Sequence, residues 1–276
     1  MRRIVVCAAA LMVMSAGLFG ADVYCGAVVK SVDYWQSGPT TQSYDGATPY
    51  TFIAIAPETS NSPDSLVSGN LKSGATVLGT FGPPNCQWTQ KFASAAAMDA
   101  AYPNGNYTLS ITGLNDGTHS STLGIGSTSY LSVPLVSNYN ALQAIDATQP
   151  FTINWGAISG AQGLDSFMLQ IRTIDIEGWG TDEVLYATPW PGQPGALNYL
   201  ATSVTVPAGV LAPGNSYEMS LMMVHMDSVD LAAYPGVPLV TGYANWDHMR
   251  IQTIPEPATL TLLTIGGLAL LRRRSR

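Results

Sequence analysis

Hydrophobic and polar residues alternate with a period of two along much of this 276-residue chain. In "FTINWGAI", Phe151, Ile153 and Trp155 fall on one face of an extended segment, as in a half-buried strand. "APGNSYEMSLMM" predicts a corner followed by a strand with Tyr217 and Met219 on its buried face. Glycine (27) and proline (18) separate such runs, which is typical of short strands joined by turns. The pattern predicts an all-β fold.

Two stretches of this pattern recur later in the chain. "TPYTFIA" (Thr48–Ala54) is similar to "QPFTINW" (Gln149–Trp155), and "YPNGNYTLSI" (Tyr102–Ile111) is similar to "APGNSYEMSL" (Ala212–Leu221). Self-similarity of this kind indicates repeated structural units. The repeat predicts two tandem β-sandwich modules, although one larger sandwich is the alternative. The predicted boundaries are module 1 at 22–134, a connection at 135–148 and module 2 at 149–253.

The second module resembles a fibronectin type III or related immunoglobulin-like sandwich over about residues 148–253. The resemblance is carried by Trp155 on an early strand and by "LAPGNSY" (Leu211–Tyr217) before a late one. It implies that the tryptophan fills the core and that the Tyr217 hydroxyl closes back on the backbone of its corner. In the first module, "FASAAAMDAAY" (Phe92–Tyr102) is alanine-rich without glycine or proline, and it predicts a short helix or turn.

The first 21 residues have the three parts of a secretory signal peptide. Arg2 and Arg3 precede an apolar run that ends near Met14, and small residues follow up to Ala21. The apolar run is too short to span a membrane comfortably. We therefore expect export by the Sec machinery and removal of residues 1–21.

The C-terminus carries a second apolar run bounded by charge. Pro255, Glu256 and Pro257 precede the apolar stretch Ala258–Leu271, and a basic cluster closes the chain at Arg272, Arg273 and Arg274. As a helix the apolar stretch would span about 21 Å, against a hydrocarbon core of roughly 30 Å. A short hydrophobic helix with a positive cytoplasmic stop suits a transient hold in the membrane during export.

In this order and position, residues 254–276 closely resemble the PEP-CTERM sorting signal. The resemblance implies processing near Pro255-Glu256-Pro257 by an exosortase, after transient anchoring of the protein in the inner membrane. It further implies a Gram-negative-type bacterium that makes an exopolysaccharide matrix, with the protein at the cell surface or in that matrix. The resemblance covers only the tail and says nothing about the body.

Composition limits the kinds of partner. Charged residues make up 11% of the chain, and of 11 Lys and Arg six lie at the two ends. The body between them keeps five, at Lys30, Lys72, Lys91, Arg172 and Arg250. A nucleic-acid partner is excluded by this scarcity of positive charge.

Three cysteines are present, and Cys7 leaves with the signal peptide. Cys25 and Cys86 then remain as an even pair in an exported chain, which favours a disulfide between them. Two independent buried thiols are the alternative.

Catalytic motifs are absent from the sequence. His119, His225 and His248 have no metal-ligand spacing, and there is no G-x-S-x-G or phosphate-binding glycine loop. His225 lies near Asp227 and is interpreted as a strand-end histidine. No catalytic residue or cofactor is therefore predicted.

The best ligand-site candidate is the proline-rich stretch from Asp175 to Tyr199. It gathers Trp179 and Trp190 with Asp182 and Glu183, in a stretch interpreted as a long loop. Flat rings beside carboxylates would suit a sugar, and calcium is the metal whose oxygen ligands match. Solvated acids and packed tryptophans are the simpler explanation, and the metal stays unknown.

Three functions compete on this sequence. The first is an exported, non-catalytic surface or matrix protein with a structural or adhesive role in an exopolysaccharide matrix. The second is a carbohydrate-binding module for that polysaccharide. The third is a glycan-active hydrolase or lyase, which would need a cleft with two carboxylates, for which no motif is present.

Overall fold

The computed structural model describes residues 21–58, 64–126, 130–132, 135–163, 165–175, 180–189 and 195–255. The predicted signal peptide, except Ala21, and the tail after Pro255 lie outside the described residues. Strands dominate the described chain, which confirms the all-β prediction. The strands are β1 (Gly26–Gly38), β2 (Thr41–Tyr44), β3 (Tyr50–Ile55), β4 (Leu66–Ser73), β5 (Thr76–Phe81), β6 (Gln87–Phe92), β7 (Gly105–Gly113), β8 (Gly117–Ile125), β9 (Phe151–Asn154), β10 (Ser166–Ile174), β11 (Gly180–Ala187), β12 (Leu197–Asn198), β13 (Ser203–Val206), β14 (Ser216–Asp230) and β15 (Leu239–Gln252).

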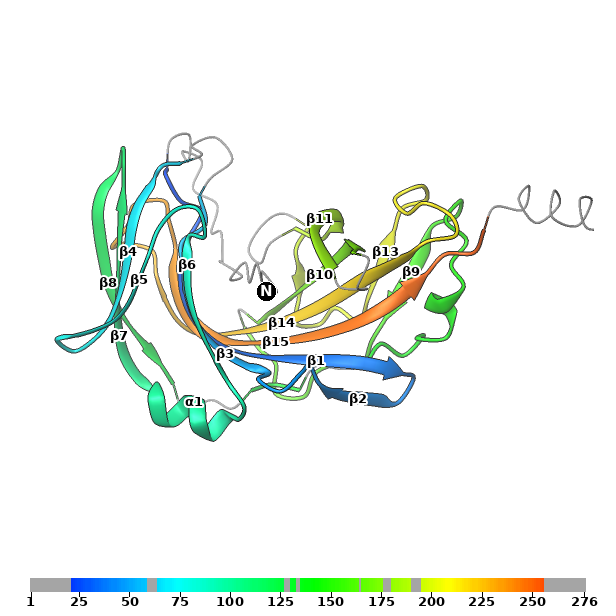
Figure 1. Ribbon diagram of the computed structural model, residues 1–276, viewed down its shortest axis with the longest axis horizontal. Coiled ribbons are helices and arrows are strands. Elements are labelled where there is room, and N and C mark those ends of the chain that lie inside the picture. The colour runs from blue at the N-terminus through cyan, green and yellow to red at the C-terminus, as the bar shows by residue number, and fades with distance from the viewer. Residues whose placement is uncertain are drawn as a thin grey trace, which may run out of the picture.

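One nine-stranded sheet runs through the whole body (Figure 1). Its order is β11-β10-β14-β15-β1-β3-β6, with β12 beside β10 and β2 beside β1. The central strands β14 and β15 have 15 and 14 residues and pair antiparallel from one lobe of the molecule to the other. β1 lies parallel to β15, and β3 continues the sheet antiparallel to β1. The long hairpin therefore connects two lobes that lie at opposite ends of the sheet.

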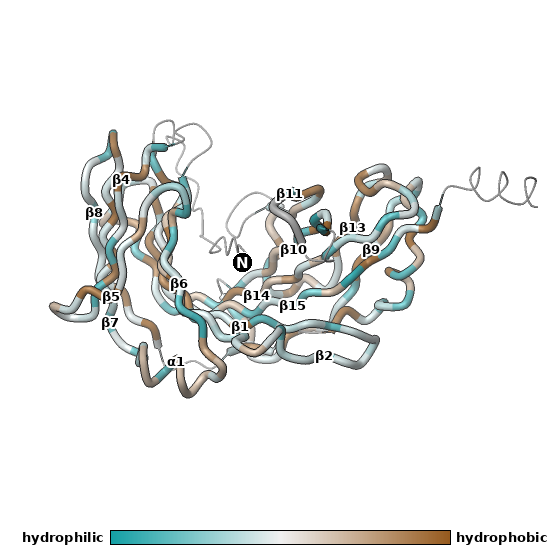
Figure 2. The backbone as a smooth tube through the Cα atoms, in the orientation of Figure 1, coloured by the Kyte–Doolittle hydropathy of each residue, from teal (hydrophilic) through white to brown (hydrophobic). Residues whose placement is uncertain are grey.

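The first lobe is a sandwich between this sheet and the four-stranded sheet β5-β4-β7-β8. β7 alternates as the sequence predicts, with Tyr107, Leu109 and Ile111 buried and the residues between them more exposed. Hydrophobic and hydrophilic positions are mixed along the strands of both lobes (Figure 2). The core also includes four residues from far along the chain: Tyr234, Val237, Leu239 and Tyr243.

The second lobe places the β9–β13 pair over β10, β14 and β15. Trp155 follows β9, is 3% exposed and lies 5.5 Å from Phe167 between ring centroids. Residues on the predicted buried faces of the neighbouring strands, such as Leu169 and Leu221, belong to the same core. The tryptophan fills the core, as the fibronectin III resemblance implies.

Both lobes contain a tyrosine that closes a corner. The Tyr217 hydroxyl accepts from the backbone N–H of Ala212 at 2.8 Å and lies 3.1 Å from its carbonyl oxygen. The Tyr107 hydroxyl donates to the carbonyl oxygen of Pro103 at 2.5 Å. The structure thus confirms the corner expected at Tyr217, and it gives a counterpart at the repeated position.

The alanine-rich stretch forms the helix α1 (Ala95–Ala101), as predicted. Ser94 caps it, since its hydroxyl accepts from the backbone N–H of Ala97 at 3.2 Å. Met98 is the buried residue of the helix. The helix covers one end of the first lobe and leads directly into the corner before β7 (Figure 1).

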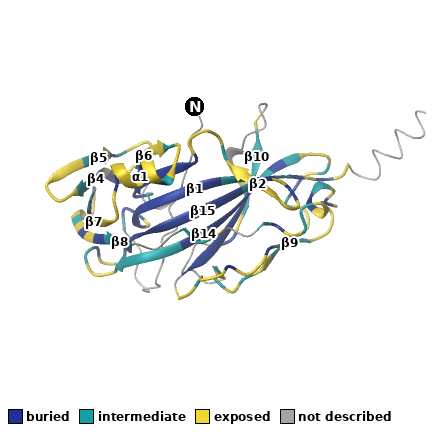
Figure 3. Ribbon diagram, turned by 90° about the horizontal axis from the view of Figure 1, so that it is seen from below, coloured by how far each residue is buried: buried dark blue, intermediate teal, exposed yellow. Residues whose placement is uncertain are grey.

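The packing of the cores does not follow the predicted module boundaries. The first core takes residues from β15 and the turn before it, because the β14–β15 hairpin extends beyond the second lobe. The predicted connection 135–148 belongs to the second core, where Val136, Leu142 and Ile145 are buried. Figure 3 shows β1 and β15 largely buried along their length, whereas β14 is only partly buried from His225 to Asp230. The boundaries remain a sequence prediction; the sheet itself is continuous across them.

Candidate functional site

The sorting motif begins where the body ends, and the last described residues are held in place. The backbone N–H of Ile254 donates to the carbonyl of Ile145 at 2.9 Å, and the Ile254 carbonyl accepts from Gly214 at 3.1 Å. Thr253 is bonded to Asn215 in the same way, at 2.9 Å. Pro255 is the last residue that the structure describes. The processing motif therefore starts directly after a fixed point of the fold.

Most of the sorting residues fall beyond that point. Glu256, Pro257 and the basic cluster Arg272, Arg273 and Arg274 lie outside the described residues. Among the helices that the structure describes, none is long and apolar enough to cross a membrane.

Where the structure describes it, the predicted ligand loop is mostly strand. Residues 180–187 form β11, which pairs with β10, and residues 197–198 form β12 on the same neighbour. Asp182 and Glu183 therefore sit on an edge strand and not on a loop. Glu183 is exposed, and its carboxylate accepts from the Thr173 hydroxyl at 3.3 Å. Trp179 and Trp190 lie outside the described residues, so their proximity to these acids stays a prediction.

The predicted disulfide is wrong for this structure, in which Cys25 and Cys86 are thiols that are not joined. Cys25 precedes β1 and Cys86 precedes β6, and both strands flank β3. The two positions are thus about two strand spacings apart, roughly 9–10 Å, beyond the separation of about 7 Å that a disulfide tolerates. Burial, followed by the charge of Glu58, raises the pKa of the Cys86 thiol.

His225 is enclosed by two carboxylates, one of which the sequence did not suggest. Its Nδ1 lies 2.6 Å from Asp165 Oδ1, and its Nε2 lies 3.4 Å from Asp227 Oδ1. Asp227 also accepts from the backbone N–H of Gly126 at 2.9 Å. Both ring nitrogens are therefore engaged where the two lobes meet, which supports a structural role for this histidine.

Two tryptophans flank a histidine on the face of the main sheet opposite the two sandwich cores. His248 stacks with Trp35 and Trp246 at centroid distances of 6.5 and 6.0 Å. Burial of His248 opposes its charged form and would lower its pKa. The hydrogen bond to Glu218 and the negative charges of Glu218 and Asp33 outweigh burial, so the pKa of His248 is raised. Trp246 is 4% exposed, so this stack is packing within the sheet face.

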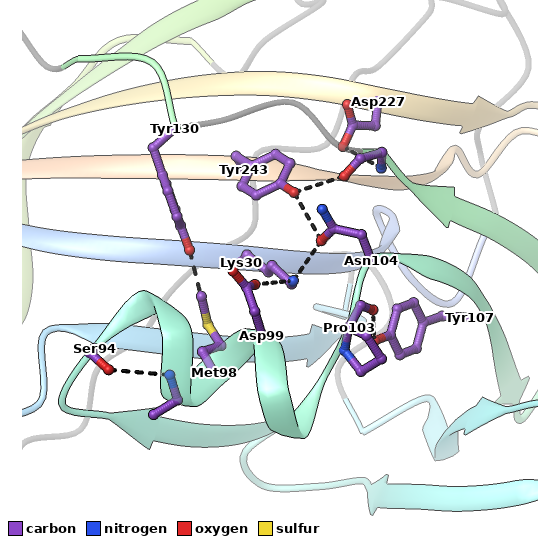
Figure 4. A network of polar contacts seen from close by, with 12 residues as sticks. Lys30, Ser94, Met98, Asp99, Pro103, Asn104, Tyr107, Tyr130, Asp227 and Tyr243 are labelled. Atoms are coloured by element: carbon purple, nitrogen blue, oxygen red, sulfur yellow. Dashed lines mark hydrogen bonds and ion pairs between the residues drawn. The ribbon is translucent and has the colours of Figure 1, made fainter.

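A polar cluster around Lys30 is the feature that the sequence analysis missed (Figure 4). Lys30 is fully buried on β1, and its amine lies 2.5 Å from Asp99 Oδ1 and 2.6 Å from Asn104 Oδ1. Tyr243 reaches the same Asn104 oxygen at 3.1 Å. The only available signal was a lysine inside the apolar run "GAVVKSV", which alternation alone reads as an outward-facing residue.

Among the described residues, no group of three or more His, Cys, Asp or Glu side chains is arranged to hold a metal ion. Several acids of the body are instead bound to backbone and hydroxyl groups. Asp22, for example, accepts from the backbone N–H groups of Asn115 and Asp116 at 2.7 and 3.0 Å. Burial alone would raise the pKa of Asp22. The hydrogen bonds from these two backbone N–H groups and from the Asn115 side-chain amide together outweigh burial, so the pKa of Asp22 is lowered.

Residues 253–275 match the model of the PEP-CTERM protein-sorting motif. The chain therefore carries this motif, which indicates an exported protein that is processed by an exosortase and directed to the cell surface. No curated protein matches the chain.

Several solved structures are similar to the body. The fibronectin(III)-like modules of Clostridium thermocellum CbhA share 11% identity over 82% of this chain and 91% of their own, with a TM-score of 0.19. The FN1–FN3 domains of chicken CNTN1 share 9% over 83% and 69%, with a TM-score of 0.24. Three N-terminal domains of the bacteriophage RB49 outer capsid protein Hoc share 8% over 84% and 71%, with a TM-score of 0.25. The fold described above rests on the strands of the chain itself.

Proposed function

We propose that this protein is a non-catalytic, structural or adhesive component of the cell surface or exopolysaccharide matrix of a Gram-negative-type bacterium. It is exported by the Sec machinery, held briefly in the inner membrane and released by an exosortase. The observation that carries the proposal is the sorting motif at residues 253–275, which starts where the last strand is tied to the body.

The arrangement of the body supports this role. A fixed end means that cleavage near Pro255 separates the tail from a folded body without loosening β15, because Thr253 and Ile254 keep their backbone partners. His225, for example, has both ring nitrogens engaged by carboxylates, which supports a structural role for this histidine. A rigid body with a detachable tail suits a protein that is delivered and then left at the surface.

The test is the C-terminus of the mature protein in its own host. We expect the chain to end near Pro255 and to fractionate with the surface or matrix. Glu256→Ala should accumulate protein that keeps its tail, whereas Gln252→Ala, an exposed change just upstream, should be processed normally. Full-length protein stably embedded in the inner membrane of a host that has its exosortase would overturn the proposal.

Carbohydrate binding is the second candidate, and one exposed aromatic pair favours it. Tyr44 on β2 is 52% exposed, and its ring lies 5.1 Å from that of Tyr34 at an interplanar angle of 25°. Aromatic rings that reach the surface can stack on sugar rings. The predicted platform at Trp179 and Trp190 is a second place where this could be tested, with or without calcium.

A glycan array with the mature protein separates these possibilities. Tyr44→Ala should abolish a signal that arises at β2, and the double change Trp179→Ala and Trp190→Ala should abolish one that arises at the predicted platform. Tyr24→Ala is the control for β2, because Tyr24 is a partly exposed tyrosine that precedes β1, whereas Tyr44 pairs with Tyr34 late in β1. If the double change lowers the melting temperature sharply, those tryptophans are core residues. If the protein binds no glycan, the structural role is the function that remains.

A further inference from the structure

The buried lysine described above has the surroundings of a reacting group. Lys30 is fully buried, between Val28 and Val32 on the core face of β1. A buried lysine is uncommon because its charge must be compensated. Its amine is placed 2.5 Å from a carboxylate, Asp99, and 2.6 Å from an amide, Asn104. A nucleophile, a proton acceptor and an acyl group therefore meet at one point.

The amide of Asn104 is the better acyl group of the two. Its oxygen is within hydrogen-bonding distance of both the Lys30 amine and the Tyr243 hydroxyl, at 2.6 and 3.1 Å. Two donors on one carbonyl oxygen polarise it and would stabilise the negative charge that develops when its carbon is attacked. The Asp99 side chain is 54% exposed, and a solvated carboxylate is a poor electrophile but a ready proton acceptor.

Tyr243 is suited to remain the donor. Burial, followed by the charge of Asp227, raises its pKa to about 12, so the hydroxyl keeps its proton at neutral pH. The hydroxyl also lies 2.9 Å from the carbonyl oxygen of Gly126, so its one proton is available to either oxygen. Figure 4 shows the Tyr243 hydroxyl and the Lys30 amine approaching Asn104 from different strands.

We propose that Lys30 and Asn104 form an intramolecular amide bond in the folded protein, with Asp99 as the proton carrier and Tyr243 as the donor to the oxygen. Asp99 takes a proton from the lysine ammonium, and the neutral amine attacks Cγ of Asn104. The Nζ–Cγ bond forms, Asp99 returns its proton to Nδ2, and the Cγ–Nδ2 bond breaks to release ammonia. The extra proton that Nζ carries after the attack passes through Asp99 to this ammonia. Overall an ammonium group and a primary amide give a secondary amide and one ammonium ion. Nothing is oxidised or reduced, and no co-reactant is needed.

The fold supplies the positioning that such an uncatalysed reaction lacks in solution. β1 is held between β15 and β3, which fixes the backbone of Lys30. Asp99 lies on α1, which Ser94 caps, and Asn104 lies in the corner that Tyr107 closes. Holding two reacting groups in contact is equivalent to a very high effective concentration of one of them. The exposed outer side of Asn104 gives the released ammonium a route to solvent.

The bond would tie the first strand of the body to a loop 74 residues later. β1 is the strand that pairs with β15 and so joins the first lobe to the long hairpin. A covalent link at Lys30 would keep β1 in the first lobe even when the sheet is pulled or partly unfolded. Such a link is useful in a protein exposed at a surface, but the inference does not depend on that function.

Peptide mapping of the denatured protein, purified from its own host, tests the proposal. The result does not depend on whether the signal peptide or the sorting tail has been removed. Trypsin should fail to cut after Lys30. A branched peptide should join the stretch around Lys30 to the stretch around Asn104, with a mass lower by one ammonia than the two linear peptides imply. Linear peptides with Lys30 cleaved and Asn104 intact would overturn the proposal, and so would a link from Lys30 to Asp99 with loss of water.

Variants identify the roles. Asn104→Ala should abolish the branched peptide, and Asp99→Asn should leave most of the protein unlinked. Asn106→Ala changes a neighbouring asparagine outside the Lys30 cluster and should keep the link. If either of the first two variants retains full linkage, the assigned roles are wrong. If they fail to fold, the map of the unchanged protein still decides whether the bond exists.

Discussion

The two lobes of this protein look alike in their tyrosine corners but differ in where their core residues come from. Every buried residue of the second core lies between Val136 and Ile251, in one continuous part of the chain. The first core combines residues from Val23 to Ile125 with four from the stretch Tyr234–Tyr243. A repeat in the sequence therefore does not guarantee two independent folding units, because one long hairpin can serve both.

The largest expected effect follows from cutting the chain in the predicted connection. Residues 21–134 alone lack four core residues and the parallel partner of β1, so we expect no cooperative melting. Residues 135–255 keep the entire second core and should melt cooperatively. Circular dichroism of each fragment measures both. If the two fragments fold equally well, the tandem-module boundaries are right and the shared core is unimportant.

A single change in the hairpin should loosen the first lobe from a distance. Tyr234 is 2% exposed, stacks on His119 at 4.0 Å and donates to Asp116 at 2.7 Å. Tyr234→Ala should cost about 3–5 kcal/mol, as large core truncations do. Hydrogen exchange should speed up in β7 and β8 and stay unchanged in β9. Leu231→Ala, at an exposed residue nearby, should change stability by less than about 0.5 kcal/mol.

A smaller effect is expected where β1 contacts the second lobe. The buried Gln36 side chain accepts from the backbone N–H of Val136 at 2.9 Å and donates to its carbonyl at 3.1 Å. Gln36→Ala leaves both backbone groups without this partner and should cost about 1–3 kcal/mol. Ser37→Ala is the exposed control. Denaturant unfolding of the full chain measures the loss, and equal stability of both variants would show that the contact contributes nothing.

The smallest effects compare the corners. Tyr217→Phe removes the acceptor of the Ala212 N–H as well as a donor, whereas Tyr107→Phe removes only a donor to Pro103. We expect losses of about 1–2 kcal/mol for the first and about 1 kcal/mol for the second. Thermal melting of the two variants side by side measures the difference. A larger loss at Tyr107 would reverse the ranking.

Local features of the fold were predictable from the residues themselves. Alternation predicted the buried face of Trp155 and its neighbours, and the resemblance of "LAPGNSY" to a fibronectin III corner implied the Tyr217 bond. Both depend on residues close together in the chain. The helix of residues 95–101 followed from alanine content and the absence of breakers. The sorting motif was equally local and needed no fold to be recognised.

The features that failed depend on strand order. Cys25 and Cys86 looked like a pair by number, but β3 lies between their strands. The acids at residues 182 and 183 looked like loop residues, but pairing with β10 placed them on an edge strand. No spacing in the sequence brings Lys30 to Asn104, since their contact requires β1 to lie beneath the corner that leads into β7.

The sequence by itself determined the all-β character, the corner at Tyr217, the short helix and the tail that directs the protein out of the cell. Each of these is encoded by periodicity, turn chemistry or a motif within a few residues, where side chains act on their own backbone. Only the tertiary structure decided that the lobes share one sheet, that the cysteines stay apart and that a buried lysine faces an amide. The separation of the cysteines comes from β3 lying between β1 and β6, and the lysine–amide contact comes from the corner before β7 lying over β1. The shared sheet comes from the pairing of β15 with β1, a contact between the two ends of the body. Many strands could satisfy the same alternation, so the pattern alone cannot select that partner.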